Sequence, residues 1–149
     1  MKQTYTYEVN GFQIHAEYEE KDIETIFIPL LKKWKGMQKK TGRRILVFLS
    51  APPGTGKTTL VQFLEYLSEQ EADMEPIQAI GLDGFHYHQQ YILTHEACVD
   101  GRIVPMKEVK GCPETYDLEK LRAKIHELRK GGEIRWPIYS RAIHDVVED

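Results

Sequence analysis

The sequence predicts an α/β fold with a parallel sheet, preceded by an N-terminal hairpin and helix. Three observations support this prediction. The unbroken apolar run at residues 45–49 is typical of a strand buried on both faces of a parallel sheet. A turn containing Gly54 and Gly56 follows this run directly. Behind the turn, apolar residues recur at helical spacing from Leu60 to Leu67, which indicates an amphipathic helix.

The first 42 residues are predicted to form an extension of this core. Apolar and polar residues alternate on both sides of Asn10-Gly11, a dipeptide that strongly favours a two-residue hairpin turn. After an acidic connector, Pro29 can open a helix whose polar end runs to Gly42. We therefore expect an N-terminal hairpin and helix at 1–42 and a nucleotide-binding core at 43–149.

Further along the chain, residues 77–82 are predicted to form a second strand of the sheet. This strand delivers Asp83 at its carboxyl end, where open α/β sheets place their ligands. Residues 84–116 show little periodicity and are expected to form a long functional loop. Asp117 then caps a helix that closes at Gly131-Gly132, and residues 134–139 can form a third strand.

Composition limits the class of protein. A chain of 149 residues with 41% hydrophobic and 29% charged residues is expected to fold as one compact domain. The net charge of −3 argues against a nucleic-acid partner, which normally requires a basic face. No apolar run approaches the roughly 20 residues of a membrane span. Two cysteines, Cys98 and Cys112, and no apolar signal segment after Met1 fit a reducing, cytoplasmic location.

Residues 51–58 form a phosphate loop, and this motif predicts binding of ATP with magnesium. Gly54 and Gly56 allow backbone N–H groups to face phosphate oxygens, Lys57 bridges the outer phosphates, and Thr58 offers its hydroxyl to magnesium. A simple glycine turn is the alternative, but the expected strand and helix flank the motif. The predicted nucleotide-binding residues are Pro53, Gly54, Thr55, Gly56, Lys57, Thr58 and Thr59.

Asp83 has three interpretations: a turn former or helix cap, a partner of magnesium together with Thr58, or the base for an attacking hydroxyl. Its predicted place at the end of a strand favours the last two. In phosphoryl transfer an ordinary carboxylate suffices to orient the hydroxyl and accept its proton late. A metal site within the long loop is the weaker hypothesis, because the spacing of its candidate ligands matches no zinc pattern. Those candidates are His86, His88, His95, Cys98 and Cys112.

Four segments together resemble a superfamily of phosphate-loop kinases that contains phosphoribulokinase, uridine kinase and bacterial pantothenate kinase. The segments are residues 51–59, 82–86, 110–117 and 136–145. The likeness is greatest to a bacterial group of nucleoside or sugar kinase-like proteins, and for that group it extends over essentially the whole chain. The resemblance implies a three-layer P-loop NTPase fold built on a parallel sheet.

The resemblance also implies roles for individual residues. Asp83 matches the aspartate that activates the acceptor hydroxyl, with Lys57 as its catalytic partner on the phosphates. Tyr116 and Asp117 match positions that border the acceptor, although Asp117 could simply cap its helix. Other matching positions close over the substrate. The substrate residues implied are Asp83, His86, Tyr116, Asp117, Tyr139, Arg141 and His144.

Relatives in this superfamily continue beyond the point that matches Asp149, with further strands, lid arginines and the segment that holds adenine. We therefore expect either a C-terminally truncated chain or a fold completed by a second copy or another chain. Arg102, Lys110 or Arg141 could replace the lid arginines.

The predicted function is transfer of the ATP γ-phosphoryl group to a hydroxyl of a small metabolite, such as a sugar, a nucleoside or a pantothenate-like molecule. A nucleotide-binding module without turnover is the alternative, and a hydrolase that transfers phosphate to water is a third hypothesis.

Overall fold

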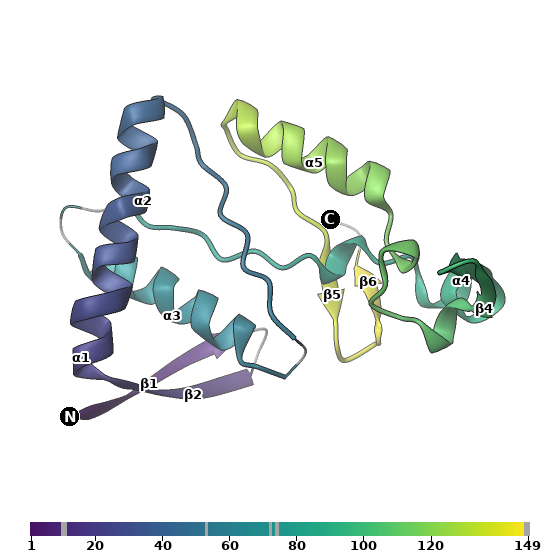
Figure 1. Cartoon of the computed structure of the whole chain (residues 1–149), viewed down its shortest axis with the longest axis horizontal. Coiled ribbons are helices and arrows are strands. Elements are labelled where there is room, and N and C mark those ends of the chain that lie inside the picture. The colour runs from purple at the N-terminus through teal and green to yellow at the C-terminus, as the bar shows by residue number, and fades with distance from the viewer. Residues whose placement is uncertain (10–11, 53, 72, 74, 148–149) are drawn as a thin grey trace. The chain divides into compact units, whose positions relative to one another are not determined.

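The computed structural model describes residues 1–9, 12–52, 54–71, 73 and 75–147 (Figure 1). Its contacts divide the chain into two compact units, Met1–Ile80 and Gly81–Asp149. This division is one of spatial contacts and does not test the domain boundary predicted at residue 42.

The first unit begins with the predicted hairpin. Strand β1 (Lys2–Val9) pairs antiparallel with β2 (Phe12–Glu19), so that Tyr5 lies opposite Ala16 and Tyr7 opposite Ile14. These four residues share one face of the hairpin because side chains alternate along a strand. The hairpin is confirmed, whereas the predicted turn residues Asn10 and Gly11 lie outside the described residues.

Helical structure follows the hairpin without a break. Helix α1 (Glu20–Asp22) leads into a π-helical turn, η1 (Ile23–Phe27), and then into α2 (Ile28–Thr41). The predicted acidic connector was therefore wrong, and carboxylates in a first helical turn are favourable because they face the positive end of the helix dipole. The predicted end of the helix is confirmed, since Gly42 caps α2 in the left-handed conformation with φ of 64°.

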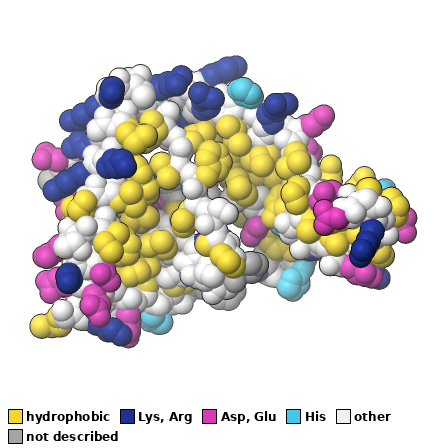
Figure 2. All heavy atoms as spheres, in the orientation of Figure 1, with side chains coloured by type: hydrophobic (Ala, Val, Ile, Leu, Met, Phe, Trp, Pro, Cys, Tyr) yellow, Lys and Arg dark blue, Asp and Glu magenta, His cyan; other side chains and the backbone are white. Residues whose placement is uncertain are grey.

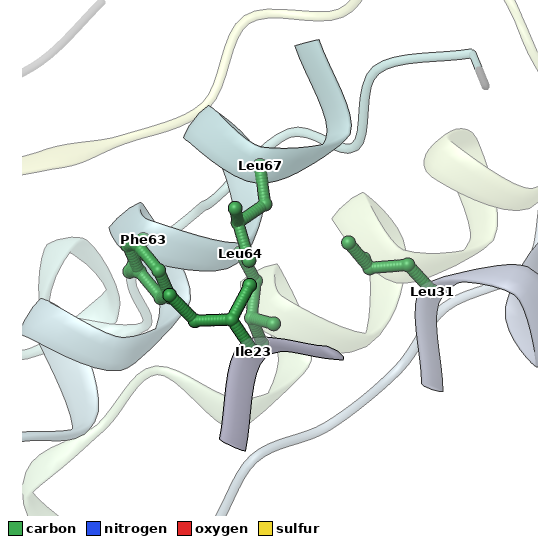
Figure 3. Packing of buried hydrophobic residues seen from close by; sticks show 5 residues of the cluster. All are labelled: Ile23, Leu31, Phe63, Leu64 and Leu67. Carbon is green, nitrogen blue, oxygen red and sulfur yellow. The ribbon is translucent and has the colours of Figure 1, made fainter. Parts of the chain in front are cut away.

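The core of this unit forms where helix α3 (Lys57–Gln70) packs on the hairpin and the preceding helical segments. Figure 3 shows the five buried residues that form it: Ile23, Leu31, Phe63, Leu64 and Leu67. The predicted apolar face of α3 is thus confirmed. Rings from the hairpin complete the core, and the ring of Tyr18 stacks on Phe63 with 4.1 Å between centroids.

The predicted parallel sheet is not found among the described residues, whose strands form three separate two-stranded antiparallel sheets. Residues 45–49 form no strand, and Phe48 is 64% exposed. Figure 2 shows hydrophobic side chains at the molecular surface. Residues 77–82 form no strand either. The backbone N–H of Ile77 instead donates to Ser68 Oγ (2.9 Å), and that of Ala79 donates to a carboxylate oxygen of Glu65 (3.2 Å).

The second unit is built from short elements where a long loop was predicted. A 3-10 turn, η2 (Asp83–Phe85), leads to α4 (Gln89–Thr94) and to a hairpin of β3 (Glu96–Val99) and β4 (Arg102–Pro105). Asp100 and Gly101, with φ of 51° and 76°, form the turn of this hairpin. Two further 3-10 turns follow, η3 (Met106–Glu108) and η4 (Pro113–Thr115).

Helix α5 (Leu118–Lys130) confirms the prediction of a helix capped by Asp117 and ended by Gly131. The predicted third strand is shorter than expected and is not part of a parallel sheet. Strand β5 (Ile138–Ser140) pairs antiparallel with β6 (Asp145–Val147). In the part of the chain that the structure describes, every helix is too short or too polar to span a lipid bilayer.

Candidate functional site

The phosphate loop lies in the first unit, directly before helix α3. Gly54 and Gly56 have φ of 74° and 82°, in the left-handed region that favours glycine. A Cβ atom on either residue would meet nothing within 4 Å. The backbone conformation, and not lack of space, therefore requires glycine at both positions.

The amino end of α3 is suited to an anion. Gly56 is the N-cap and supplies no side-chain acceptor, and the first turn contains no acidic residue. The first N–H groups of a helix have no partner within the helix, and here the dipole adds positive potential to them. Phosphate groups bind at such helix ends. The end of the loop therefore combines two left-handed glycines with a helix start that has no side-chain cap.

The Lys57 side chain lies over its own loop. Its Nζ donates to the carbonyl oxygens of Ala51 (2.7 Å) and Pro52 (2.8 Å). The Thr55 hydroxyl donates to the same Pro52 oxygen (2.8 Å). Thr58 is exposed at the start of α3, and Pro53 lies outside the described residues. The ammonium group thus stands beside the turn to which the motif assigns the phosphates.

Tyr7 fastens the hairpin to this helix. Its phenol donates to the backbone oxygen of Thr59 in the first turn of α3 (2.7 Å). Burial raises the pKa of Tyr7 to about 12, and the neighbouring phenol of Tyr18 adds to the shift. The Tyr7 phenol therefore stays protonated and remains a donor throughout the physiological pH range.

A second group of predicted residues gathers in the second unit. An antiparallel bridge joins His86 to Tyr116, and their rings lie 3.8 Å apart between centroids. The ring of Tyr139 lies 6.0 Å from that of His86. The backbone N–H of Asp117 donates to the Phe85 oxygen (2.8 Å), which holds the two segments together. We call His86, Tyr116 and Tyr139 the aromatic cluster.

Asp83 begins the turn η2 beside this cluster. Burial raises the pKa of the Tyr116 phenol, and the negative charge of Asp83 raises it further. The chain around Asp83 is held in place by Trp136, whose Nε1 donates to the Gly81 oxygen (2.7 Å). Asp83 is exposed, so its carboxylate is accessible to a ligand.

Lys110 adds a positive charge to the aromatic cluster. Its Nζ donates to the Tyr139 hydroxyl (3.0 Å) and to the side-chain oxygen of Gln89 (2.9 Å). The imidazole Nε2 of His86 is buried and has no hydrogen-bond partner among the described residues. From the sequence, Lys110 was predicted only as a substitute for lid arginines. Gln89 was not predicted, and no local sequence signal marks it.

Arg141 and His144 lie apart from these contacts. Both are exposed in the turn between β5 and β6, where His144 has φ of 54°. Within the described residues, no hydrogen bond or ring contact joins either of them to the aromatic cluster. Asp117 uses its carboxylate to cap α5, accepting the backbone N–H of Lys120 (2.9 Å).

Asp145 organises this unit and was not predicted. Its Oδ1 accepts the backbone N–H groups of Gln89 (2.9 Å) and Val146 (2.7 Å), and it lies 3.4 Å from His88 Nδ1. The Gln89 N–H is the largest of the influences that lower the pKa of the Asp145 carboxyl. Over the described residues, no three His, Cys, Asp or Glu side chains gather as a metal site would require.

The chain is similar to several known proteins. The uncharacterized protein YggC of Escherichia coli (strain K12) is 39% identical, over 95% of this chain and 56% of its own length. A pantothenate kinase of Enterococcus faecalis (strain ATCC 700802 / V583) is 28% identical, over 86% of this chain and 44% of its own. A pantothenate kinase of Lactococcus lactis subsp. lactis (strain IL1403) is 23% identical, over 90% of this chain and 46% of its own.

No family model and no solved structure matches the chain. The chain spans about half the length of the curated relatives it matches, namely 56%, 44% and 46% of the three named above. Over most of its own residues it is homologous to YggC and, more distantly, to bacterial pantothenate kinases.

Proposed function

We propose that this chain provides the catalytic site of an ATP-dependent kinase that phosphorylates a hydroxyl of a small metabolite. The observation that carries the proposal is the phosphate loop, with two left-handed glycines before an uncapped helix and Lys57 beside it. The distant pantothenate kinase homologues support a kinase over other classes of phosphate-loop protein.

On the nucleotide side, Lys57 exchanges its contacts with two backbone oxygens for contacts with the outer phosphates. Its ammonium group then neutralises charge that accumulates during transfer. The exposed hydroxyl of Thr58 fits magnesium, which prefers oxygen ligands and is commonly shared with phosphate oxygens. Bound magnesium would supply further charge neutralisation at the phosphates.

On the acceptor side, Asp83 orients the attacking hydroxyl and accepts its proton. Because the transition state of phosphoryl transfer is loose, this proton is transferred late and a carboxylate of ordinary basicity suffices. The aromatic cluster borders the acceptor, and the hydroxyl of Tyr139 offers it a polar contact.

The positive charge of Lys110 beside Tyr139 favours an acceptor that carries a negative charge. Pantothenate has both a hydroxyl and a carboxylate, and two of the relatives named above are called pantothenate kinases. A pantothenate-like acid is therefore our first choice of acceptor, ahead of a neutral sugar or nucleoside.

The proposal is tested by measuring ADP release from ATP and Mg²⁺ across pantothenate, sugars and nucleosides. We expect one acceptor to raise ADP release above background and Asp83→Asn to abolish that increase. Asp100→Asn is the matched control, because Asp100 is an exposed turn residue with a left-handed backbone that asparagine tolerates. It should retain full activity.

Three outcomes would contradict the proposal. ATP binding without acceptor-stimulated ADP release would support a nucleotide-binding module. ADP release that needs no acceptor would support a hydrolase. Equal activity of the Asp83→Asn variant and the wild type would remove Asp83 from the catalytic role.

A further inference from the structure

Helix α2 carries a positive charge that no acidic residue of its own segment offsets. Residues 25–64 contain no Asp or Glu, so all 23 acidic residues of the chain lie outside this segment. Because the whole chain has a net charge of −3, positive and negative charges are strongly segregated along it. The basic residues on α2 and just after it are Lys32, Lys33, Lys35, Lys39, Lys40, Arg43 and Arg44.

The core of the first unit determines which side of α2 faces outward. Leu31 is 1% exposed and Trp34 packs on the same buried cluster, so this side of the helix faces the core. Lys33, Met37 and Lys40 are spaced by four and three residues, so they share one face of the helix, and all three are exposed. With two exposed neighbours they form what we call the basic face: Lys32, Lys33, Met37, Lys39 and Lys40.

The ammonium groups of the basic face are available to a partner. In the part of the chain that the structure describes, none of its four lysines forms an ion pair with a carboxylate. The carboxylate of Glu75 does contact α2, but it accepts a hydrogen bond from the side chain of Gln38 (2.8 Å), which is half-buried. Figure 2 shows Lys and Arg side chains gathered over α2.

We propose that the basic face binds the surface of a bilayer that contains anionic phospholipids. Clusters of about four to eight Lys or Arg residues on an amphipathic helix are typical of such binding, because the negative surface attracts them within a Debye length. Helix α2 lies along this surface, since it cannot cross the bilayer. The inference goes beyond the proposed kinase activity and does not depend on it.

Exposed apolar side chains favour a lipid surface over a nucleic acid. Met37 is 49% exposed between Lys33 and Lys40, and Ile26 in η1 is 52% exposed. At a bilayer such side chains enter the acyl boundary, while lysine stems extend their charges to the headgroups. A nucleic-acid backbone offers apolar side chains no counterpart. The ring of Trp34 packs against the core, so it is not presented on the basic face for stacking on bases.

The test measures cosedimentation of the full chain with lipid vesicles. Vesicles of equal parts phosphatidylcholine and phosphatidylglycerol are compared with vesicles of phosphatidylcholine alone. We expect binding to the anionic vesicles only, and weaker binding as salt is added, because salt screens exposed charges. The double variant Lys33→Gln, Lys40→Gln should bind more weakly by about fivefold for each lysine removed.

The double variant Lys107→Gln, Lys130→Gln is the matched control. It removes the same two charges from exposed positions in the second unit, so its net charge equals that of the first double variant. It should bind anionic vesicles as the wild type does. Glutamine and lysine have similar helix propensities, so thermal unfolding should be unchanged in both variants. Met37→Gln keeps every charge and should weaken vesicle binding by about fivefold through the lost apolar contact.

Double-stranded RNA is titrated in parallel as the competing polyanion. Binding to this RNA that Lys33→Gln, Lys40→Gln weakens and Met37→Gln leaves unchanged would assign the basic face to a nucleic acid and overturn the inference. Absence of binding to anionic vesicles, or equal binding by the two double variants, would also overturn it. None of these outcomes affects acceptor-dependent ADP release, so the kinase proposal is tested separately.

Discussion

Lys57 is the residue on which the proposed nucleotide binding depends most directly. In the described structure its ammonium group is held by the carbonyl oxygens of Ala51 and Pro52, which are neutral acceptors. Phosphate oxygens are charged acceptors and form stronger hydrogen bonds with an ammonium group. The Lys57 side chain would therefore form stronger hydrogen bonds with a bound triphosphate than with the loop backbone.

Replacing Lys57 by alanine should weaken ATP binding by about tenfold or more, since a hydrogen bond to a charged group is lost. Lys32→Ala is the control, because Lys32 is an exposed lysine on α2 in the same unit. Calorimetric titration with ATP and Mg²⁺ distinguishes the two variants. Unchanged affinity in Lys57→Ala would contradict the assignment of the phosphate loop.

Asp145 controls the acid stability of the second unit. Its pKa is lowered chiefly by the Gln89 N–H, so the folded state favours the ionised carboxylate. This contribution is present above the unfolded pKa of about 3.8 and is lost as the pH falls through the lower folded pKa.

Asp145→Asn should therefore reduce the free energy of unfolding by about 1 kcal/mol at pH 7. In the variant, the two backbone N–H groups donate to a neutral amide oxygen instead of a charged carboxylate. The difference between the variant and the wild type should shrink in acid, because the wild-type carboxyl is protonated as the pH falls through its lowered pKa. Urea unfolding at two pH values, pH 7 and an acidic one, measures the difference. A deficit that is equal at the two pH values would show that charge is not the cause.

At the scale of elements, Gly84 explains why the turn η2 and strand β5 can approach each other. A Cβ atom at Gly84 would overlap the backbone carbonyl of Pro137 and lie 2.8 Å from the Ile138 nitrogen. Backbone atoms cannot move aside as a flexible side chain can. The contact brings the segment containing Asp83 against the segment that leads to Tyr139, so glycine at this position helps to assemble the aromatic cluster.

Gly84→Ala should lower the free energy of unfolding by about 2 kcal/mol or more, because the added methyl group cannot be accommodated without a backbone shift. Gly36→Ala is the matched control, since a Cβ there meets nothing within 4 Å. Gly36 lies within α2, where alanine should instead stabilise the helix by about 0.5–1 kcal/mol. Chemical denaturation of the two variants checks the prediction. A neutral Gly84→Ala would refute the close approach.

Elements with short-range signals were predictable from the sequence. The alternation around Asn10-Gly11 identified the first hairpin, and Asp117 with Gly131 marked both ends of α5. The same kind of signal at Asp100-Gly101 could have revealed the β3–β4 hairpin, but its strands have only four residues each and show little alternation. Short strands therefore escaped a reading based on periodicity.

At the scale of the whole molecule, the apolar runs at 45–49 and 77–82 indicated burial but could not identify pairing partners. A strand inside a sheet needs hydrogen-bonding neighbours that are distant in sequence, and an apolar pattern does not specify them. In the described residues no strand pairs with 45–49, and the side chains of α3 take the N–H groups of Ile77 and Ala79. For this reason the prediction of a parallel sheet was wrong, whereas the prediction of helix α3 was confirmed.

The candidate site, like the fold, was predictable only in part from the sequence. The motif segments identified Asp83, His86, Tyr116 and Tyr139, which the second unit brings into one region. The bond from Lys110 to Tyr139 is a tertiary contact over 29 residues and has no signature in the local sequence. The sequence therefore indicated which residue types the site contains, whereas the charge beside Tyr139 required the structure.

The central claim is phosphoryl transfer from ATP to a small hydroxyl-bearing acid, and one measurement tests it most directly. The full chain is incubated with Mg²⁺, pantothenate and ATP carrying an isotope label in its γ-phosphoryl oxygens, and the acceptor is analysed by mass spectrometry. Our account predicts that the acceptor gains one labelled phosphoryl group. Label that stays in ATP, or appears only in inorganic phosphate, with pantothenate and with every sugar and nucleoside tested in its place, would contradict it.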